Sequence, residues 1–202
     1  MPRFVGLPRA SFEMQKALTA SAANYGCPML WADGITPDAP LVEEFQGELN
    51  FTDEDLAGRY RELSPKGKVD LIVIGCPQAS VGEAREAAAA VRARMELGEA
   101  IPNHRLWLFM SSHNYDLISL DGTLDILEEA GALVLRDTCP EVTPYNRSKY
   151  NHLLTNSLKA EHYLTSGLNR IPTSVAPIME CVSHAFDESL IDAPPPELGG
   201  QH

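Results

Sequence analysis

Several signatures of enzymes and membrane proteins are missing from this sequence of 202 residues. No GxGxxG fingerprint follows an apolar strand, and no Walker GxxxxGK[ST] loop, HExxH pair or GxSxG elbow occurs. No uncharged apolar run reaches the roughly 18 residues that a membrane span needs. Nucleotide-dependent enzymes, zinc proteases, α/β-hydrolases and integral membrane proteins therefore find no support in the sequence.

Positive charge is also scarce. Lys and Arg together number 16 against 28 Asp and Glu, which gives a net charge of −12, and no basic run offsets it locally. Such a surface repels phosphate backbones and anionic lipids, so we expect no nucleic acid and no membrane as partner. The first 18 residues lack the continuous apolar core of a secretory signal, which predicts a cytoplasmic protein.

Cysteine is infrequent and unclustered. The four cysteines form no CxxC pair and are spread along the chain as Cys27, Cys76, Cys139 and Cys181. In a reducing compartment such cysteines are core residues, metal ligands or nucleophiles. Cys27 begins an apolar segment away from any polar motif, and we assign it to packing.

Apolar runs and helical patterns alternate along the chain. Residues 69–75, 105–112 and 132–140 read as buried strands, and residues 80–97, 122–131 and 156–165 read as helices. A further helix and a short strand are expected at 9–25 and 27–32, and another helix at 53–64. This order predicts a three-layer α/β fold with a mostly parallel sheet and flanking helices, organised as a single domain over residues 1–190 with a flexible tail at 191–202.

The expected strand ends carry sulfur and small polar groups. Because parallel strands open at one edge, Cys76 and Cys139 should lie along a single rim of the sheet. Cys76, Cys139 and Cys181 each precede or begin an expected helix, where the helix dipole stabilises a thiolate. Three thiolates suit a metal or cluster with one position open to substrate, although each cysteine taken singly is also compatible with a place in the core.

A second cluster of polar residues is "TNSLKAEHYL", residues 155–164. Asn156, Ser157 and Lys159 fall at the start of the expected helix, where main-chain N–H groups and a cation can hold a carboxylate or phosphate. The alternative is that Asn156 or Ser157 only caps the helix while Lys159 is solvated.

Taken together, the motifs "GITPDAP", "GCPQASVGEA", "DTCPEV", "TNSLKAEHY" and "MECVSHA", in this order, resemble the C-terminal part of the catalytic large subunit of the aconitase X family. The resemblance covers most of the chain. It implies an aconitase-like domain of a hydro-lyase that dehydrates a small hydroxy acid at an iron–sulfur centre or iron. The family's known substrates are cis-3-hydroxy-L-proline, which we favour here, and mevalonate 5-phosphate.

The same resemblance implies roles for single residues. Cys76, Cys139 and Cys181 correspond to the metal ligands, and Asn156, Ser157 and Lys159 to contacts with the substrate anion. The family's usual GCPH reads GCPQ here, with Gln78 in place of the histidine. The family's large subunit also has an N-terminal portion before the matched region, and a small swivelling domain or subunit is thought to bring a serine base. We therefore expect this chain to need one or both as partners.

Two interpretations of other classes stay open. A chain that lacks half of its family's architecture could be a truncated interaction module, which docks through an apolar face that the missing half would cover. The same cysteines could also hold a structural zinc ion, in which case chelation would unfold the protein.

Overall fold

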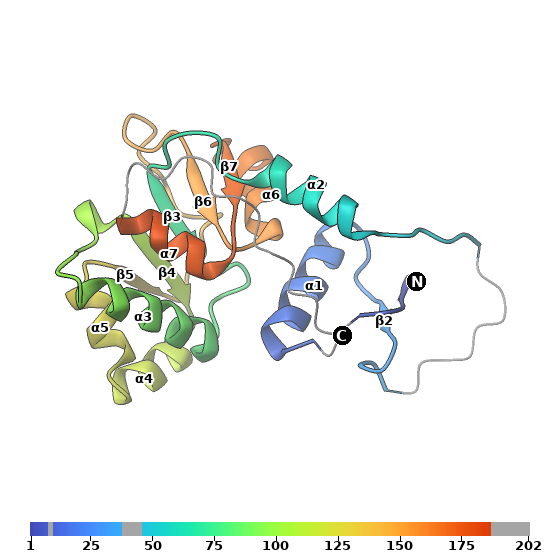
Figure 1. The fold of residues 1–202 in the computed structure, drawn as a ribbon, viewed down its shortest axis with the longest axis horizontal. Coiled ribbons are helices and arrows are strands. Elements are labelled where there is room, and N and C mark those ends of the chain that lie inside the picture. Colours follow the sequence, from blue (N-terminus) through green and yellow to red (C-terminus); the bar gives the residue numbers. More distant parts are fainter. Residues whose placement is uncertain (8–9, 38–45, 187–202) are drawn as a thin grey trace. The chain divides into compact units, whose positions relative to one another are not determined.

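Short apolar runs form a parallel sheet in the computed structural model, which describes residues 1–7, 10–37 and 46–186 (Figure 1). Within these residues the main sheet has five strands, in the order β5 (Leu133–Arg136), β4 (Leu106–Met110), β3 (Leu71–Ile74), β6 (Leu153–Thr155) and β7 (Thr173–Val175). All neighbouring strands are parallel. The central strand β3 is buried at every position, because both faces of the sheet are covered.

Helices cover both faces of this sheet. Alternate residues of β3 point to opposite sides, with Ile72 and Ile74 in one hydrophobic cluster and Leu71 and Val73 in the other. The first cluster is closed by α3 (Val81–Met95), α4 (Ser112–Leu120), α5 (Thr123–Glu129) and α7 (Ile178–Phe186). The second is closed by α6 (Leu158–Ser166) and by aromatic residues of the irregular segment that follows β5. The predicted three-layer α/β fold is thus confirmed.

The chain divides into two compact units, residues 1–51 and residues 52 onward, where the sequence predicted a single domain over residues 1–190. The second unit begins with α2 (Asp53–Leu63) and contains the five-stranded sheet, with a short 3₁₀ turn at Pro102–His104 before β4. The first unit contains β1 (Arg3–Phe4), α1 (Phe12–Asn24) and β2 (Trp31–Ala32). The predicted tail at 191–202 lies outside the described residues.

The strand order reverses direction at the centre of the sheet. From β3 the chain moves outward through β4 to β5, and it then returns to the other side of β3 for β6 and β7. In open α/β sheets, ligands bind outside the carboxyl ends of the strands that flank such a switch point. The carboxyl ends of β3 and β6 are therefore the place where a site is expected.

None of the helices within the described ranges is both long enough and apolar enough to cross a membrane.

Candidate functional site

Two of the predicted site residues, Cys76 and Asn156, lie at the switch point, each just after the carboxyl end of a strand. Cys76 follows β3 by two residues, and Asn156 directly follows β6, the strand hydrogen-bonded to β3. Cys139 follows β5, on the far side of β4 from β3. Because all of these strands are parallel, the three residues follow carboxyl ends at one edge of the sheet. The sequence predicted this edge for Cys76 and Cys139, and it predicted Asn156 only at the start of a helix.

Hydrogen bonds join the loops that carry these residues. Gln78 Nε2 donates to the main-chain oxygen of Thr138 at 3.1 Å, which links the loop after β3 to the residue before Cys139. Ser157 Oγ donates to the main-chain oxygen of Cys76 and accepts from the backbone N–H of Ala160 at 3.1 Å. Ser157 is therefore the N-cap of α6 and also fixes the Cys76 loop against that helix.

The turn after β3 requires glycine. Gly75 has a φ of 118°, and a Cβ atom at this position would lie 2.2 Å from the main-chain oxygen of Phe109. The next turn is tied to the same oxygen, which accepts from the backbone N–H of Ala79 at 2.7 Å. Close approach of the turn to β4 thus sets the direction in which the chain leaves β3 and presents Cys76.

The thiols of Cys76 and Cys139 both influence the pKa of the same side chain, Tyr145. The Tyr145 hydroxyl is buried and donates to the main-chain oxygen of Pro140 at 3.0 Å. Burial raises the pKa of Tyr145 well above its usual value, and the thiols of Cys139 and Cys76, together with Glu141, raise it further. Both cysteines therefore lie within electrostatic range of one phenol, with Cys76 buried and Cys139 half-buried.

Two buried oxygen atoms at the end of β6 lack a hydrogen-bond partner among the described residues. They are Oγ1 of Thr155, a fully buried residue, and Oδ1 of Asn156. Buried polar atoms are normally paired, so unpaired ones at the switch point indicate hydrogen bonds made to a water or a ligand. Half-buried Lys159 follows in the first turn of α6 and adds a positive charge beside the helix N-terminus.

Cys181 has a different environment. It lies inside α7, fully buried in the cluster that α3 and α7 close, and its Sγ is 3.4 Å from the main-chain oxygen of Ala176. Burial raises the pKa of the Cys181 thiol, and the nearby Glu180 raises it further. Cys181 packs in the hydrophobic cluster on the opposite face of the sheet from Cys76, near the start of the helix that follows β7. The expected helix after Cys139 is an irregular segment.

The residues at this edge fit part of an iron–sulfur site. Clusters are usually held by several cysteine thiolates, and Cys76 and Cys139 supply two thiols there. Within the described residues, no three side chains of His, Cys, Asp or Glu come together as a metal-binding group.

Sequence reasoning missed Thr155 and Tyr145. The signal for Thr155 was present, since it is the polar last residue of an apolar run at the start of "TNS". Tyr145 gave no comparable signal, because it lies in an irregular segment and reaches the edge only through tertiary packing.

Comparison with known proteins agrees with this geometry. Residues 69–187 match the family described as the aconitase X third domain. The phosphomevalonate dehydratase large subunit of Methanothermobacter thermautotrophicus is 30% identical over 181 residues, which are 81% of this chain and 41% of that protein. The cis-3-hydroxy-L-proline dehydratase of Hypocrea jecorina is 26% identical over 205 residues, covering 93% of this chain and 33% of that protein.

A solved structure supports the same relationship. The holo-form of Thermococcus kodakaraensis aconitase X matches with a TM-score of 0.79 and 25% identity, over 91% of this chain and 47% of that one. The chain therefore spans less than half the length of these relatives. With more than half of its residues matching the third-domain family, the chain belongs to the aconitase X family.

Proposed function

We propose that this chain is part of an aconitase X-type hydro-lyase, which dehydrates a small hydroxy acid at an iron–sulfur or iron centre. The observation that carries the proposal is the carboxyl edge of the sheet, where Cys76 and Cys139 follow β3 and β5 and the buried oxygens of Thr155 and Asn156 lie at the end of β6. Its relatives are named dehydratases, and several are named large subunits. We place the activity in the cytoplasm, in an assembly that also contains the portion of these relatives that this chain does not span and a small swivelling subunit.

The residues of this chain have separate tasks in the proposal. Cys76 and Cys139 would hold part of the iron centre, which when bound supplies a Lewis acid for a departing hydroxyl group. Lys159 and the N-terminus of α6 hold the substrate carboxylate. Thr155 and Asn156 orient the substrate through hydrogen bonds that no group in the described part of the chain makes. Ser157 already donates its hydroxyl proton to the main-chain oxygen of Cys76, so its task is to position the Cys76 loop.

For the substrate we propose cis-3-hydroxy-L-proline. This imino acid carries one carboxylate, and the predicted anion site contributes one cation, Lys159. Mevalonate 5-phosphate carries a carboxylate and a phosphate dianion, which need more positive charge than this site and a chain of net charge −12 supply. It is the second candidate because the relative at 30% identity is a phosphomevalonate dehydratase large subunit.

The test is anaerobic isolation of the tagged chain, with whatever assembly it forms, from the organism that encodes it. Iron, sulfide and zinc are quantified, a visible absorption spectrum is taken, and both substrates are assayed. Iron with sulfide, and turnover of cis-3-hydroxy-L-proline, support the proposal. Turnover of mevalonate 5-phosphate alone overturns the substrate, and stoichiometric zinc without iron overturns the cluster.

Two cysteine variants sharpen this test. Cys139→Ala should lose the iron and its absorption, because it removes a thiol at the edge of the sheet. Cys181→Ala removes a thiol from the core cluster beneath α7 and should keep the iron. Equal iron loss in both folded variants would contradict the assignment of the site to Cys76 and Cys139.

A further inference from the structure

The first unit is a βαβ element without a closed core. β1 and β2 pair in parallel, with Arg3 opposite Trp31, and α1 makes the crossover between them. A two-stranded sheet is marginally stable alone, and here its outer edges carry no further strand within the described residues. Such an element normally forms one piece of a larger sheet.

Apolar side chains in this unit are exposed instead of buried. Within residues 1–7, 10–37 and 46–51, Ala32 is the one buried apolar residue, and α1 has no buried residue at all. Large side chains stay in contact with solvent, at exposed fractions of 59% to 73% for Val5, Phe12, Met14, Tyr25, Met29 and Phe51. An apolar surface of this extent in so small a unit marks a contact face.

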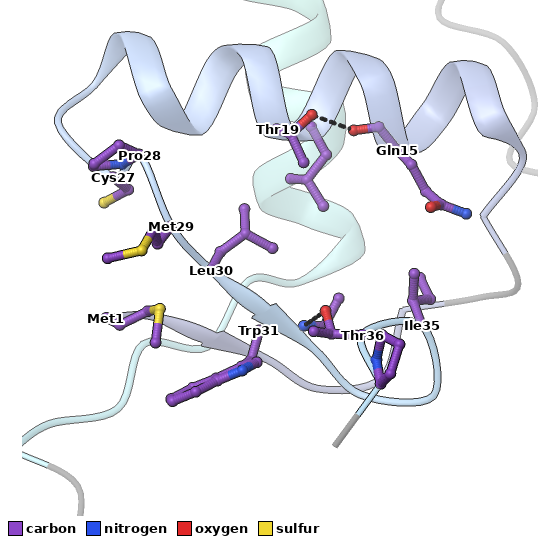
Figure 2. A pocket seen from close by; sticks show the side chains of 13 residues that line it. Met1, Gln15, Thr19, Cys27, Pro28, Met29, Leu30, Trp31, Ile35 and Thr36 are labelled. Carbon is purple, nitrogen blue, oxygen red and sulfur yellow. Dashed lines mark hydrogen bonds between the residues drawn. The ribbon is translucent and has the colours of Figure 1, made fainter. Parts of the chain in front are cut away.

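A hollow of about 560 Å³ lies between α1 and the strand pair (Figure 2). It is the space where the core of a βαβ element would be. Leu18 and Thr19 line it from α1, and Leu30, Trp31 and Ile35 line it from the segment around β2. No Asp, Glu, Lys or Arg side chain is among the described residues that line it. A segment that fills this hollow must be apolar and uncharged.

The frame of the hollow is held in place by polar contacts. Arg3 donates from Nε and Nη2 to the two carboxylate oxygens of Asp33, at 2.7 Å and 2.9 Å, and so joins the ends of β1 and β2. Thr36 Oγ1 accepts from the backbone N–H of Ala32 at 3.0 Å (Figure 2). Ser11 caps α1 by accepting from the backbone N–H of Met14 at 3.2 Å. These contacts fix the strand pair and the start of α1 around the hollow.

We propose that this hollow receives an apolar segment from the portion of an aconitase X large subunit that the chain does not span. The match to the Thermococcus kodakaraensis structure covers 91% of this chain, so it extends into residues 1–51, and more than half of that structure lies outside the match. The inference rests on the proposed function, and it identifies the surface through which this chain would contact the rest of the hydro-lyase. A second copy of this chain fits less well, since it offers another hollow and adds another charge of −12.

The experiment places a photoreactive benzoylphenylalanine at position 29, on the rim of the hollow, in the full chain expressed in its own organism. After irradiation, the crosslinked peptide is identified by mass spectrometry. We expect a peptide of aconitase X sequence from the region that this chain does not cover. The matched control carries the same group at position 120, an exposed leucine at the end of α4, and should give at least ten-fold less of that product.

A second pair of variants measures the contact without a crosslinker. Met29→Glu places a charge in an uncharged hollow and should reduce co-purification of that polypeptide at least ten-fold, while Leu120→Glu leaves it unchanged. A crosslink to a second copy, to an unrelated protein, or to nothing above the control overturns the proposal. The readout does not use catalysis, so an iron-free, inactive assembly with the expected crosslink would refute the proposed function and keep the docking surface.

Discussion

Ser157 Oγ donates a hydrogen bond to the main-chain oxygen of Cys76, which lies 81 positions earlier in the chain. The same hydroxyl oxygen of Ser157 accepts the backbone N–H of Ala160 and caps α6. One hydroxyl group therefore connects the two strands that flank the switch point. Its loss should affect both the stability of the second unit and the position of the Cys76 loop.

Ser157→Ala should lower the free energy of unfolding by about 1–2 kcal/mol, because it removes a helix cap and one further hydrogen bond. Urea denaturation followed by circular dichroism measures this change. Ser111→Ala is the matched control, since Ser111 caps α4 in the same way, with the N–H of Asn114 at 3.2 Å. Ser157→Ala should lower iron content or turnover in the assembly and Ser111→Ala should not. Equal changes in iron content and turnover in the two variants would show that Ser157 acts only as a helix cap.

The cysteines should differ sharply in chemical reactivity. Cys181 is fully buried and its pKa is raised, so at about pH 8 its thiol stays protonated, whereas the half-buried Cys139 can meet a reagent. We expect alkylation by iodoacetamide to be about 100-fold slower at Cys181 than at Cys139 in the folded, metal-free chain. Peptide mass spectrometry of timed samples measures both rates. Comparable rates would show that α7 does not protect Cys181.

Much of the second unit could be predicted from its sequence. The buried runs of β3 and β4 are continuous and rich in β-branched or aromatic residues, β5 is a half-buried edge strand, and the capping box of Ser80 and Glu83 marks the start of α3. The short strand β6 was missed as a strand, because three residues give no periodicity. Helix α4 was missed because its sequence, SHNYDLISL, mixes polar and apolar residues and buries one side chain, Ile118.

The site was predicted in part. The rule that parallel strands open at one edge brought Cys76 and Cys139 together without knowledge of the strand order. Asn156 was predicted only at the start of a helix, and its place at this edge follows from β6, which was missed as a strand. Cys181 begins a motif much like the others, yet Ala176 and the α3 cluster enclose it, and sequence alone does not show on which side of a sheet a helix packs. The open core of the first unit could not be predicted from the sequence either, because the apolar pattern of α1 is the same whether or not another segment covers it.

Glycine is required at position 75 and replaceable at position 58. Gly75→Ala should destabilise the protein by about 3 kcal/mol or more, because its Cβ would meet a main-chain oxygen at a positive φ. Gly58 lies in α2 with open space where a Cβ would be added, so Gly58→Ala should stabilise by about 0.5–1 kcal/mol. Thermal unfolding of the two variants measures the contrast. A Gly75→Ala protein as stable as the wild type would contradict the close approach of this turn to β4.

Acid should weaken the second unit through Asp121. Its pKa is lowered from 3.8 to about 2 by hydrogen bonds from the Thr123 side chain, the Arg85 guanidinium and the Thr123 backbone. A carboxyl group whose pKa is lower in the folded than in the unfolded chain stabilises the fold at any pH above its unfolded-state pKa. This contribution is lost as the pH falls from about 4 to about 2. In Asp121→Asn, the melting temperature should therefore fall less steeply across this window than in the wild type. Asp125→Asn changes the net charge equally and is the matched control, so a parallel change in both variants would assign the effect to overall charge instead of to the pairing of Asp121 with Arg85 and Thr123.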